Sequence, residues 1–160
     1  MDTFQIQPIT VDDCDWISEF LHEHWDYSEI VTRGQVHYSD ELNGFIASHA
    51  GNRIGLATYY LEGGECELVT INSLSEGMGI GTELLKAVIQ TAVKENCSRI
   101  WTIVTNDNVN ALRFFQTRGF VCAALHRNAV EKSRELNPDI PSLGFHNIPI
   151  RDEIELEMNF

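Results

Sequence analysis

Basic residues are scarce in this sequence of 160 residues, which has 11 lysines and arginines against 24 aspartates and glutamates, a formal net charge of −13 at pH 7. Proteins bind nucleic-acid backbones through basic side chains that displace counterions, so this balance argues against a nucleic-acid partner. The sequence also lacks an apolar run of the about 18–20 residues that span a bilayer, and its first residues carry no basic signal-peptide segment. We therefore expect a cytoplasmic protein with no membrane partner.

Cysteine pairs are absent as well, because the four cysteines stand singly and none is spaced Cys-x-x-Cys like a zinc knuckle or a redox motif. Among the six histidines, His22 and His24 are the closest in sequence. Two residues apart on a helix, they point to different sides and cannot share a metal ion easily. No metal site is expected.

What the sequence does contain is enough apolar material, 43% of its residues, for the core of one domain spanning residues 1–160. Its alternating and helical patterns predict a mixed α/β fold, in which two successive hairpins form an antiparallel meander. The expected strands are Thr3–Pro8, Gly44–His49, Arg53–Leu61, Cys66–Asn72, Arg99–Val104, Phe120–Leu125 and Ile154–Met158. The expected helices run from Thr10 to about Trp25 and over Ile80–Lys94, Asn108–Arg118 and Ala129–Leu136.

Two regions are less regular. Residues 26–41 show no clear period, and we expect them to connect the flanking elements with a short helix or strand. Residues 126–160 form a C-terminal extension that holds three of the four prolines and ends in the last strand. That strand can pair within the sheet or across a homodimer, and both alternatives stay open.

The most informative segment is Ser75–Thr82, Ser-Glu-Gly-Met-Gly-Ile-Gly-Thr, which lies between an expected strand and an expected helix. Its alternating glycines let the backbone approach a ligand closely, and the helix N-terminus behind them favours an anion such as pyrophosphate. It is not a P-loop, because no lysine follows Gly81, and its G-x-G-x-G spacing differs from the G-x-G-x-x-G of dinucleotide sites. A flexible loop whose glycines serve only the turn is the competing interpretation.

The segment resembles the pyrophosphate loop of the GNAT superfamily of N-acetyltransferases, Gln/Arg-x-x-Gly-x-Gly/Ala, with Glu76 in place of the glutamine or arginine. A second segment, residues 108–120, is similar to the family pattern Asn-x-x-Ala-x-x-x-Tyr-x-x-x-Gly-Phe. Asn108 and Ala111 match it, and Phe115 stands where the family has tyrosine. Asn108 would also cap its helix, which is a sufficient structural reason for it. The resemblance covers roughly residues 3–125.

This resemblance implies a mixed, mostly antiparallel sheet with a splayed central strand pair, flanked by helices. Acetyl-CoA, the cosubstrate, would bind between Cys66–Asn72 and Arg99–Val104, and the N–H near Ile71 would polarise the thioester carbonyl. The coenzyme-binding residues that it implies are Val69, Ile71, Asn72, Ser73, Glu76, Gly77, Met78, Gly79, Ile80, Gly81, Thr82, Asn108, Ala111 and Phe115.

The implied reaction is direct transfer of the acetyl group to a primary amine of a small molecule or peptide in a ternary complex. An alkyl amine has a pKa near 10.4 and must lose a proton, so a general base is useful. Glu67 is the first candidate and Glu65 the second, although Glu67 also fits an outward, solvated strand position. Phe115 cannot protonate the departing thiolate, which favours the alternative of a noncatalytic acyl-CoA-binding or regulatory module.

The charge is distributed unevenly, since residues 1–75 hold 13 acidic and two basic residues, net −11, and the remainder only −2. In the resembled fold the first helix and the region after it form the wall of the acceptor site. We therefore expect a cationic amine as acceptor, with Trp25, Tyr27 and Tyr38 as candidate aromatic contacts. A core position for Trp25 and a solvated acidic helix face are the competing interpretation.

Overall fold

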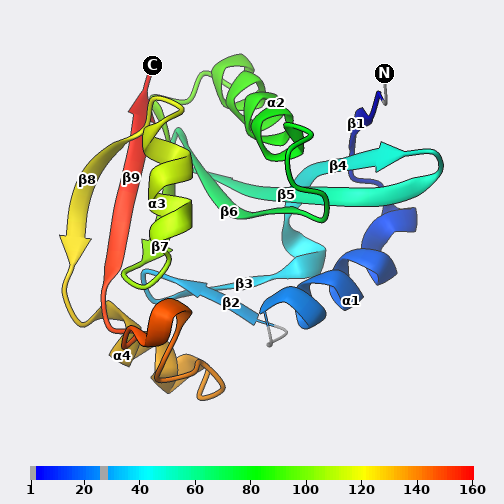
Figure 1. Cartoon of the computed structure of the whole chain (residues 1–160). Coiled ribbons are helices and arrows are strands. Elements are labelled where there is room, and N and C mark those ends of the chain that lie inside the picture. Colours follow the sequence, from blue (N-terminus) through cyan, green and yellow to red (C-terminus); the bar gives the residue numbers. More distant parts are fainter. Residues whose placement is uncertain (1–2, 26–28) are drawn as a thin grey trace.

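The structure is a computed structural model that describes residues 3–25 and 29–160 (Figure 1). Its strands form a seven-stranded sheet in the order β1-β4-β5-β6-β7-β9-β8 and a separate two-stranded sheet of β2 and β3. The strands are β1 (Gln5–Pro8), β2 (Glu29–Thr32), β3 (Gln35–Tyr38), β4 (Asn43–His49), β5 (Asn52–Glu62), β6 (Glu65–Ser73), β7 (Arg99–Thr105), β8 (Val121–His126) and β9 (Glu153–Asn159). The helices are α1 (Cys14–Trp25), α2 (Ile80–Lys94), α3 (Val109–Gln116) and α4 (Ala129–Leu136), with 3-10 turns at Val11–Asp13, Ser39–Glu41 and Phe145–Asn147. Among the described residues, no helix is both long enough and apolar enough to cross a membrane.

Three tight hairpins organise the first half of the chain. Each turns through two residues with positive φ, as in type I′ turns, and the pairs are Arg33-Gly34, Ala50-Gly51 and Gly63-Gly64. Two of these hairpins build the predicted meander of β4, β5 and β6. The third joins β2 to β3, so the region that was expected to hold one short helix or strand holds a hairpin with a sheet of its own.

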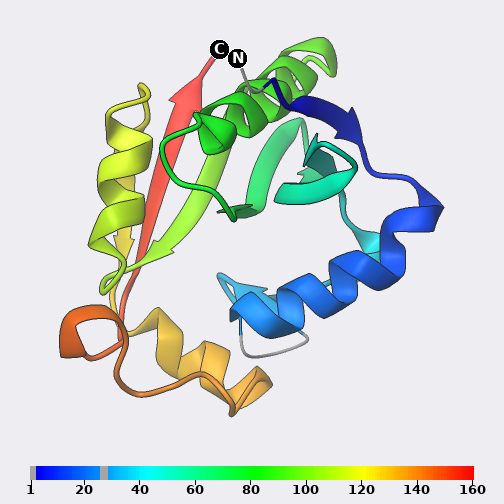
Figure 2. The same cartoon turned by 45° about the vertical axis from the view of Figure 1, so that its right-hand side comes forward.

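The helices cover two faces of the large sheet, with α2 and α3 on one face and α1, the β2–β3 hairpin and α4 toward the other (Figures 1 and 2). Consecutive strand residues alternate between two apolar clusters, as the period of a β-strand requires. In β6, for example, Leu68 packs in the cluster with α2 and α3, whereas Val69 packs in the cluster with α1 and β2. The helices are thereby fixed to the sheet by burial of apolar side chains on both faces.

All neighbouring strands of the large sheet are antiparallel except β6 and β7, which are parallel. Their pairing extends only over Cys66–Leu68 and Ile100–Thr102, after which the two strands separate. The mixed, mostly antiparallel sheet with a splayed central pair is therefore confirmed. Strand β9 lies between β7 and β8, which confirms pairing within the sheet and leaves neither edge of β9 open to a second copy of the chain.

Candidate functional site

A cavity of about 190 Å³ lies where β6 and β7 separate. Residues 68–72 of β6 and 102–105 of β7 line it on two sides, and residues 30–32 of β2 line it from the hairpin. Helix α3 contributes Ala111 and Phe115, its N-cap is Asn108, which also lines the cavity, and β9 contributes Glu153. Six of the expected coenzyme-binding residues, Val69, Ile71, Asn72, Asn108, Ala111 and Phe115, are thereby brought together around one cavity.

Asn108 holds the first turn of α3 against this cavity. Its side-chain oxygen accepts a hydrogen bond from the Ala111 N–H at 3.1 Å, which confirms the predicted N-cap. Phe115, one turn further on, is buried and packs against Phe114 and Phe120. Its ring supplies an apolar wall at the place where the family pattern has a tyrosine.

The glycine loop connects the end of β6 to the start of α2, and its three glycines have two different structural reasons. Gly77 and Gly79 have φ angles of +79° and +75°, a left-handed conformation that side-chain-bearing residues adopt only at a cost. Gly81 lies inside α2, where an added Cβ would come within 3.3 Å of the Phe114 ring. The loop therefore exposes backbone groups at the helix start, and α3 packs closely against the first turn of α2.

The side chains of the loop differ in their surroundings. Glu76 is exposed, Met78 packs partly against the core, and Ile80 is buried. Ser73, at the end of β6, donates its hydroxyl to the carbonyl of Ser75 at 2.9 Å. None of these residues lines the cavity. The N-terminus of α2, which follows the loop, has the free backbone N–H groups that make helix starts suitable for anions.

Arg118 is a neighbour of the loop that the sequence analysis missed. Its Nε donates to the Thr82 hydroxyl at 3.0 Å, and its guanidinium lies 3.8 Å from the centre of the Phe114 ring. A further hydrogen bond, 2.9 Å long, runs from Arg118 to the carbonyl of Phe114. These contacts hold a positive charge beside the first turn of α2, where it adds to the helix dipole.

Glu67 is buried under the β2–β3 hairpin, with only 3% of its surface exposed. The Thr32 hydroxyl donates to its Oε1 at 2.5 Å, and the His37 Nε2 lies 3.2 Å from its Oε2 and 3.0 Å from the Thr32 oxygen. The outward, solvated interpretation of Glu67 is therefore wrong. Glu67 does not line the cavity, but its hydrogen-bond partner Thr32 does.

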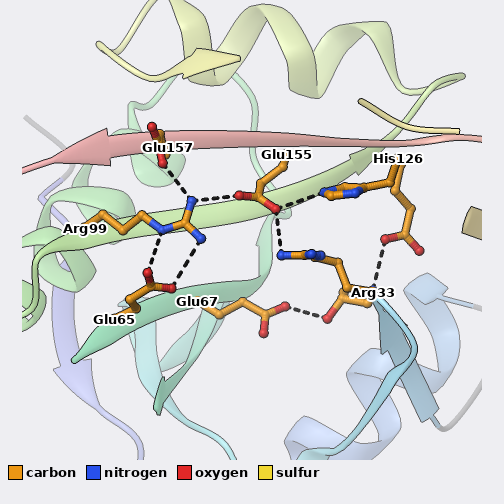
Figure 3. Close-up of polar contacts among 9 residues, drawn as sticks. Arg33, Glu65, Glu67, Arg99, His126, Glu155 and Glu157 are labelled. Carbon is orange, nitrogen blue, oxygen red and sulfur yellow. Dashed lines mark hydrogen bonds and ion pairs between the residues drawn. The ribbon is translucent and has the colours of Figure 1, made fainter. Parts of the chain in front are cut away.

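A second polar cluster joins β6, β7 and β9 at the closed end of the strand pair (Figure 3). Arg99 contacts Glu65 at 3.1 Å and both Glu155 and Glu157 at 2.7 Å. Burial alone would raise the pKa of Glu155, but hydrogen bonds from Arg99 and His126 outweigh it and hold the pKa below its usual value. The hydrogen bond from Arg99 likewise lowers the pKa of Glu157. Glu65, the second candidate base, is therefore engaged in an ion pair.

Glu153 begins β9 and is also missed by the sequence analysis. Its Oε1 accepts from the Ser133 hydroxyl at 3.2 Å, and its Oε2 accepts from the Arg33 backbone N–H at 3.0 Å. The strand pattern indicates a start at Ile154, so nothing in the local sequence distinguishes this residue. Only the approach of α4 and the hairpin turn to β9 places it at the cavity.

Of the three aromatic residues proposed for the acceptor wall, the structure describes the side chain of Tyr38 alone. Tyr38, in β3, is about half exposed and is not among the cavity residues. The side chain of Trp25 and the whole of Tyr27 lie outside the described residues. The acidic residues of α1 that the structure describes, Asp15, Glu19 and Glu23, are exposed on the surface.

Comparison with known proteins agrees with this geometry. The sequence model of the Acetyltransferase (GNAT) family matches residues 9–120. Uncharacterized protein YdhI of Bacillus subtilis (strain 168) is 44% identical over 139 residues, which cover 86% of this chain and 87% of YdhI. A GNAT family acetyltransferase from Elizabethkingia anophelis with acetyl-CoA bound has a TM-score of 0.73 at 20% identity, and the match covers 100% of both chains. The ribosomal-protein-S18-alanine N-acetyltransferase of Escherichia coli has a TM-score of 0.67 at 15% identity, covering 98% of this chain and 94% of that one.

The family match and the splayed strand pair lead to the same assignment. The matched segment contains the glycine loop, the α3 motif and most of the residues around the cavity. The chain therefore belongs to the GNAT acetyltransferase family, whose cosubstrate is acetyl-CoA.

Proposed function

We propose that this protein transfers the acetyl group of acetyl-CoA directly to a primary amine of a small molecule or peptide in a ternary complex. The observation that carries the proposal is the cavity between β6 and β7, which is lined by six of the residues expected to bind the coenzyme. The family membership supplies the class of reaction. The named activity of the Escherichia coli relative, an N-acetyltransferase acting on alanine, supports an amine as the acceptor.

The donor half of the site fits a coenzyme that is extended in the middle and anionic at one end. Beyond Leu68, the edge of β6 is separated from β7, so a pantetheine arm can align with it like an additional strand. The N–H near Ile71 is the proposed donor to the thioester carbonyl. At the end of β6, the backbone of Gly77–Thr82 and the guanidinium of Arg118 would hold the pyrophosphate.

The acceptor half carries buried carboxylates that suit a cationic amine. Glu67 is linked to the cavity through the Thr32 hydroxyl, so we propose that it supports proton removal through that hydroxyl rather than by direct contact. The acidic surface of the first half of the chain would attract the same kind of acceptor over a longer range. Screening by salt would then weaken acceptor binding.

The departing thiolate has no tyrosine at position 115 to protonate it, because Phe115 forms that wall of the cavity. A thiolate of pKa about 8.5 is a tolerable leaving group near neutral pH, so transfer can proceed without the acid. The second candidate function, a noncatalytic acyl-CoA-binding or regulatory module, is favoured by Phe115 and by the exposed Glu76 in the pyrophosphate loop.

Thiol release separates the two candidates. After calorimetry has established acetyl-CoA binding, coenzyme release is followed with a polyamine, an aminoglycoside and a lysine-containing peptide as acceptors. We expect amine-dependent release with at least one of them and an acetylated amine in the mass spectrum. Tight acetyl-CoA binding without amine-dependent release from any acceptor would instead establish the binding module.

A further inference from the structure

We propose that Glu153 binds the ammonium group of the acceptor and takes its proton, so that Glu153 is the base in contact with the amine. This inference rests on the proposed N-acetyltransferase function and names the residue that the acceptor meets. It is carried by the position of Glu153 at the cavity, by its burial, and by the lack of a cation among its described partners.

The position comes from the register of the sheet. Glu153 pairs with Thr105 of β7 on one side and with His126 of β8 on the other. Thr105 and Glu153 both line the cavity between the separated strands, and the backbone of β6 lines its other side. An acetyl thioester aligned along β6 would therefore share this cavity with the Glu153 carboxylate.

The charge of Glu153 is buried and is not balanced by any described cation. Only 2% of the residue is exposed, and its two hydrogen-bond donors, the Ser133 hydroxyl and the Arg33 backbone N–H, are both neutral. Glu155, two residues further along the strand, instead forms ion pairs with Arg33 and Arg99 and a hydrogen bond with His126. Burying a carboxylate without a cation costs free energy, and an ammonium group in the cavity would offset that cost.

Glu67 is less suited to direct contact with the amine. Both of its oxygens are engaged, one by the Thr32 hydroxyl and the other by His37, and it does not line the cavity. It accepts the Thr32 hydroxyl and so fixes the direction of that O–H bond, and Thr32 is the member of this set that lines the cavity. Glu67 is therefore a positioning residue, and Glu153 is the group that the acceptor touches.

The chemical step balances without a further reactant. The Glu153 carboxylate takes one proton from the ammonium group and becomes a carboxylic acid, which leaves a neutral amine. The nitrogen lone pair then forms a bond to the thioester carbon, and the C–S bond breaks with its electron pair on sulfur. The second proton lost from nitrogen goes to the thiolate, and the acid of Glu153 returns its proton to solvent.

The test is Glu153→Gln, which removes the charge but keeps both hydrogen bonds. The amide oxygen can accept from the Arg33 N–H, and the amide NH₂ can donate to the Ser133 oxygen. With the most active amine of the panel, we expect kcat/KM to fall by about 100-fold or more, the usual scale of a lost general base. The acetyl-CoA affinity and the Tm should not fall.

Two matched variants separate a catalytic role from a structural one. Ser133→Ala removes a neutral partner of Glu153, and we expect kcat/KM to stay within about threefold. Glu67→Gln should cost less than Glu153→Gln, because Glu67 acts through Thr32.

Several results would overturn the inference while leaving the proposed function intact. One is a fall in kcat/KM of less than threefold in Glu153→Gln. The others are a fall in Ser133→Ala equal to that in Glu153→Gln, or a fall in Glu67→Gln larger than that in Glu153→Gln. If Glu153→Gln does not fold, Glu153→Asp decides, because it keeps the charge but withdraws it by about 1.5 Å. It should then lower kcat/KM about tenfold or more, and unchanged kinetics would refute a contact with the amine. A wild-type protein that transfers acetyl to no amine would refute both proposals.

Discussion

Replacing Arg99 by methionine should destabilise the fold by a predictable and pH-dependent amount. Removing one partner of a buried ion pair costs about 3–5 kcal/mol, and a pair at the surface is worth about 0–1 kcal/mol. Arg99 forms ion pairs with Glu65, Glu155 and Glu157 (Figure 3). Arg99 has 16% of its side chain exposed, and its partner Glu155, with 6%, is more buried than Glu157 with 22% or Glu65 with 38%. Because Glu155 keeps Arg33 and His126, we expect a loss of about 2–3 kcal/mol, below the full buried-pair cost.

The pH dependence follows from the direction of the pKa shifts. Arg99 lowers the pKa of Glu155 and Glu157 in the folded protein, relative to about 4.5 in an unfolded chain. Their contribution to stability is therefore fully present above pH 4.5 and is lost as the pH falls through the lowered values. The stability gap between wild type and Arg99→Met should consequently be largest near neutral pH and should shrink in acid.

Urea unfolding of both proteins at several pH values measures this gap. For a chain of this size, a loss of 2–3 kcal/mol should also lower the Tm by roughly 4–12 °C. Arg33→Met is the matched control, because Arg33 pairs with the same Glu155 at 3.0 Å but has 44% of its side chain exposed. It should cost only about 0–1 kcal/mol. A pH-independent loss in Arg99→Met, or a loss no greater than in Arg33→Met, would refute the reasoning.

Three further predictions concern the coenzyme site. Gly79→Ala should cost about 1–2 kcal/mol of stability, because its φ is +75°, and should weaken acetyl-CoA binding. The control Gly51→Ala, in the turn between β4 and β5 with a φ of +81°, should cost the same stability and leave the affinity for acetyl-CoA unchanged. Arg118→Met removes a positive charge beside the proposed pyrophosphate site and should weaken acetyl-CoA binding about tenfold in calorimetry. Glu76→Gln removes a negative charge and should tighten it. If both variants changed the affinity in the same direction, charge at the loop would not determine coenzyme binding. Phe115→Tyr should raise turnover severalfold by adding a proton donor at the cavity, and unchanged turnover would show that the missing acid does not limit the rate.

The proposed donor half of the site could be located from the sequence because local motifs encode it, and six of its expected residues line one cavity. The loop from Gly77 to Gly81 and the helix beginning after Asn108 are continuous segments with a diagnostic spacing. The helical spacing of apolar residues likewise predicted a helix over Ile80–Lys94, which the structure confirms as α2. Strand ends differed by one or two residues, because the outermost residues of β5 and β6 are paired by the backbone and carry no apolar signal.

The acceptor half could not be predicted, because its parts are distant in sequence and polar. Thr32 and His37 belong to four-residue strands that pair only with each other, and their turn uses Arg33-Gly34 instead of the common Asn-Gly. Glu153 is separated from them by more than 100 residues. A single polar residue in a short segment leaves no periodic pattern in the sequence. Only the tertiary fold therefore shows that Thr32, His37 and Glu153 lie close together.

The β2–β3 hairpin bears on how the specificity of this protein can change in evolution. Its strands share no backbone ladder with the large sheet, yet it provides Thr32 and the Arg33 N–H to the acceptor side. The proposed donor side is built from β6, α2 and α3, and its side-chain bonds to the hairpin run from Glu67 of β6 to Thr32 and His37. Under the proposed function, substitutions within the ten residues of this hairpin would change the choice of acceptor, while the glycine loop and the α3 motif of the coenzyme site would keep their sequence.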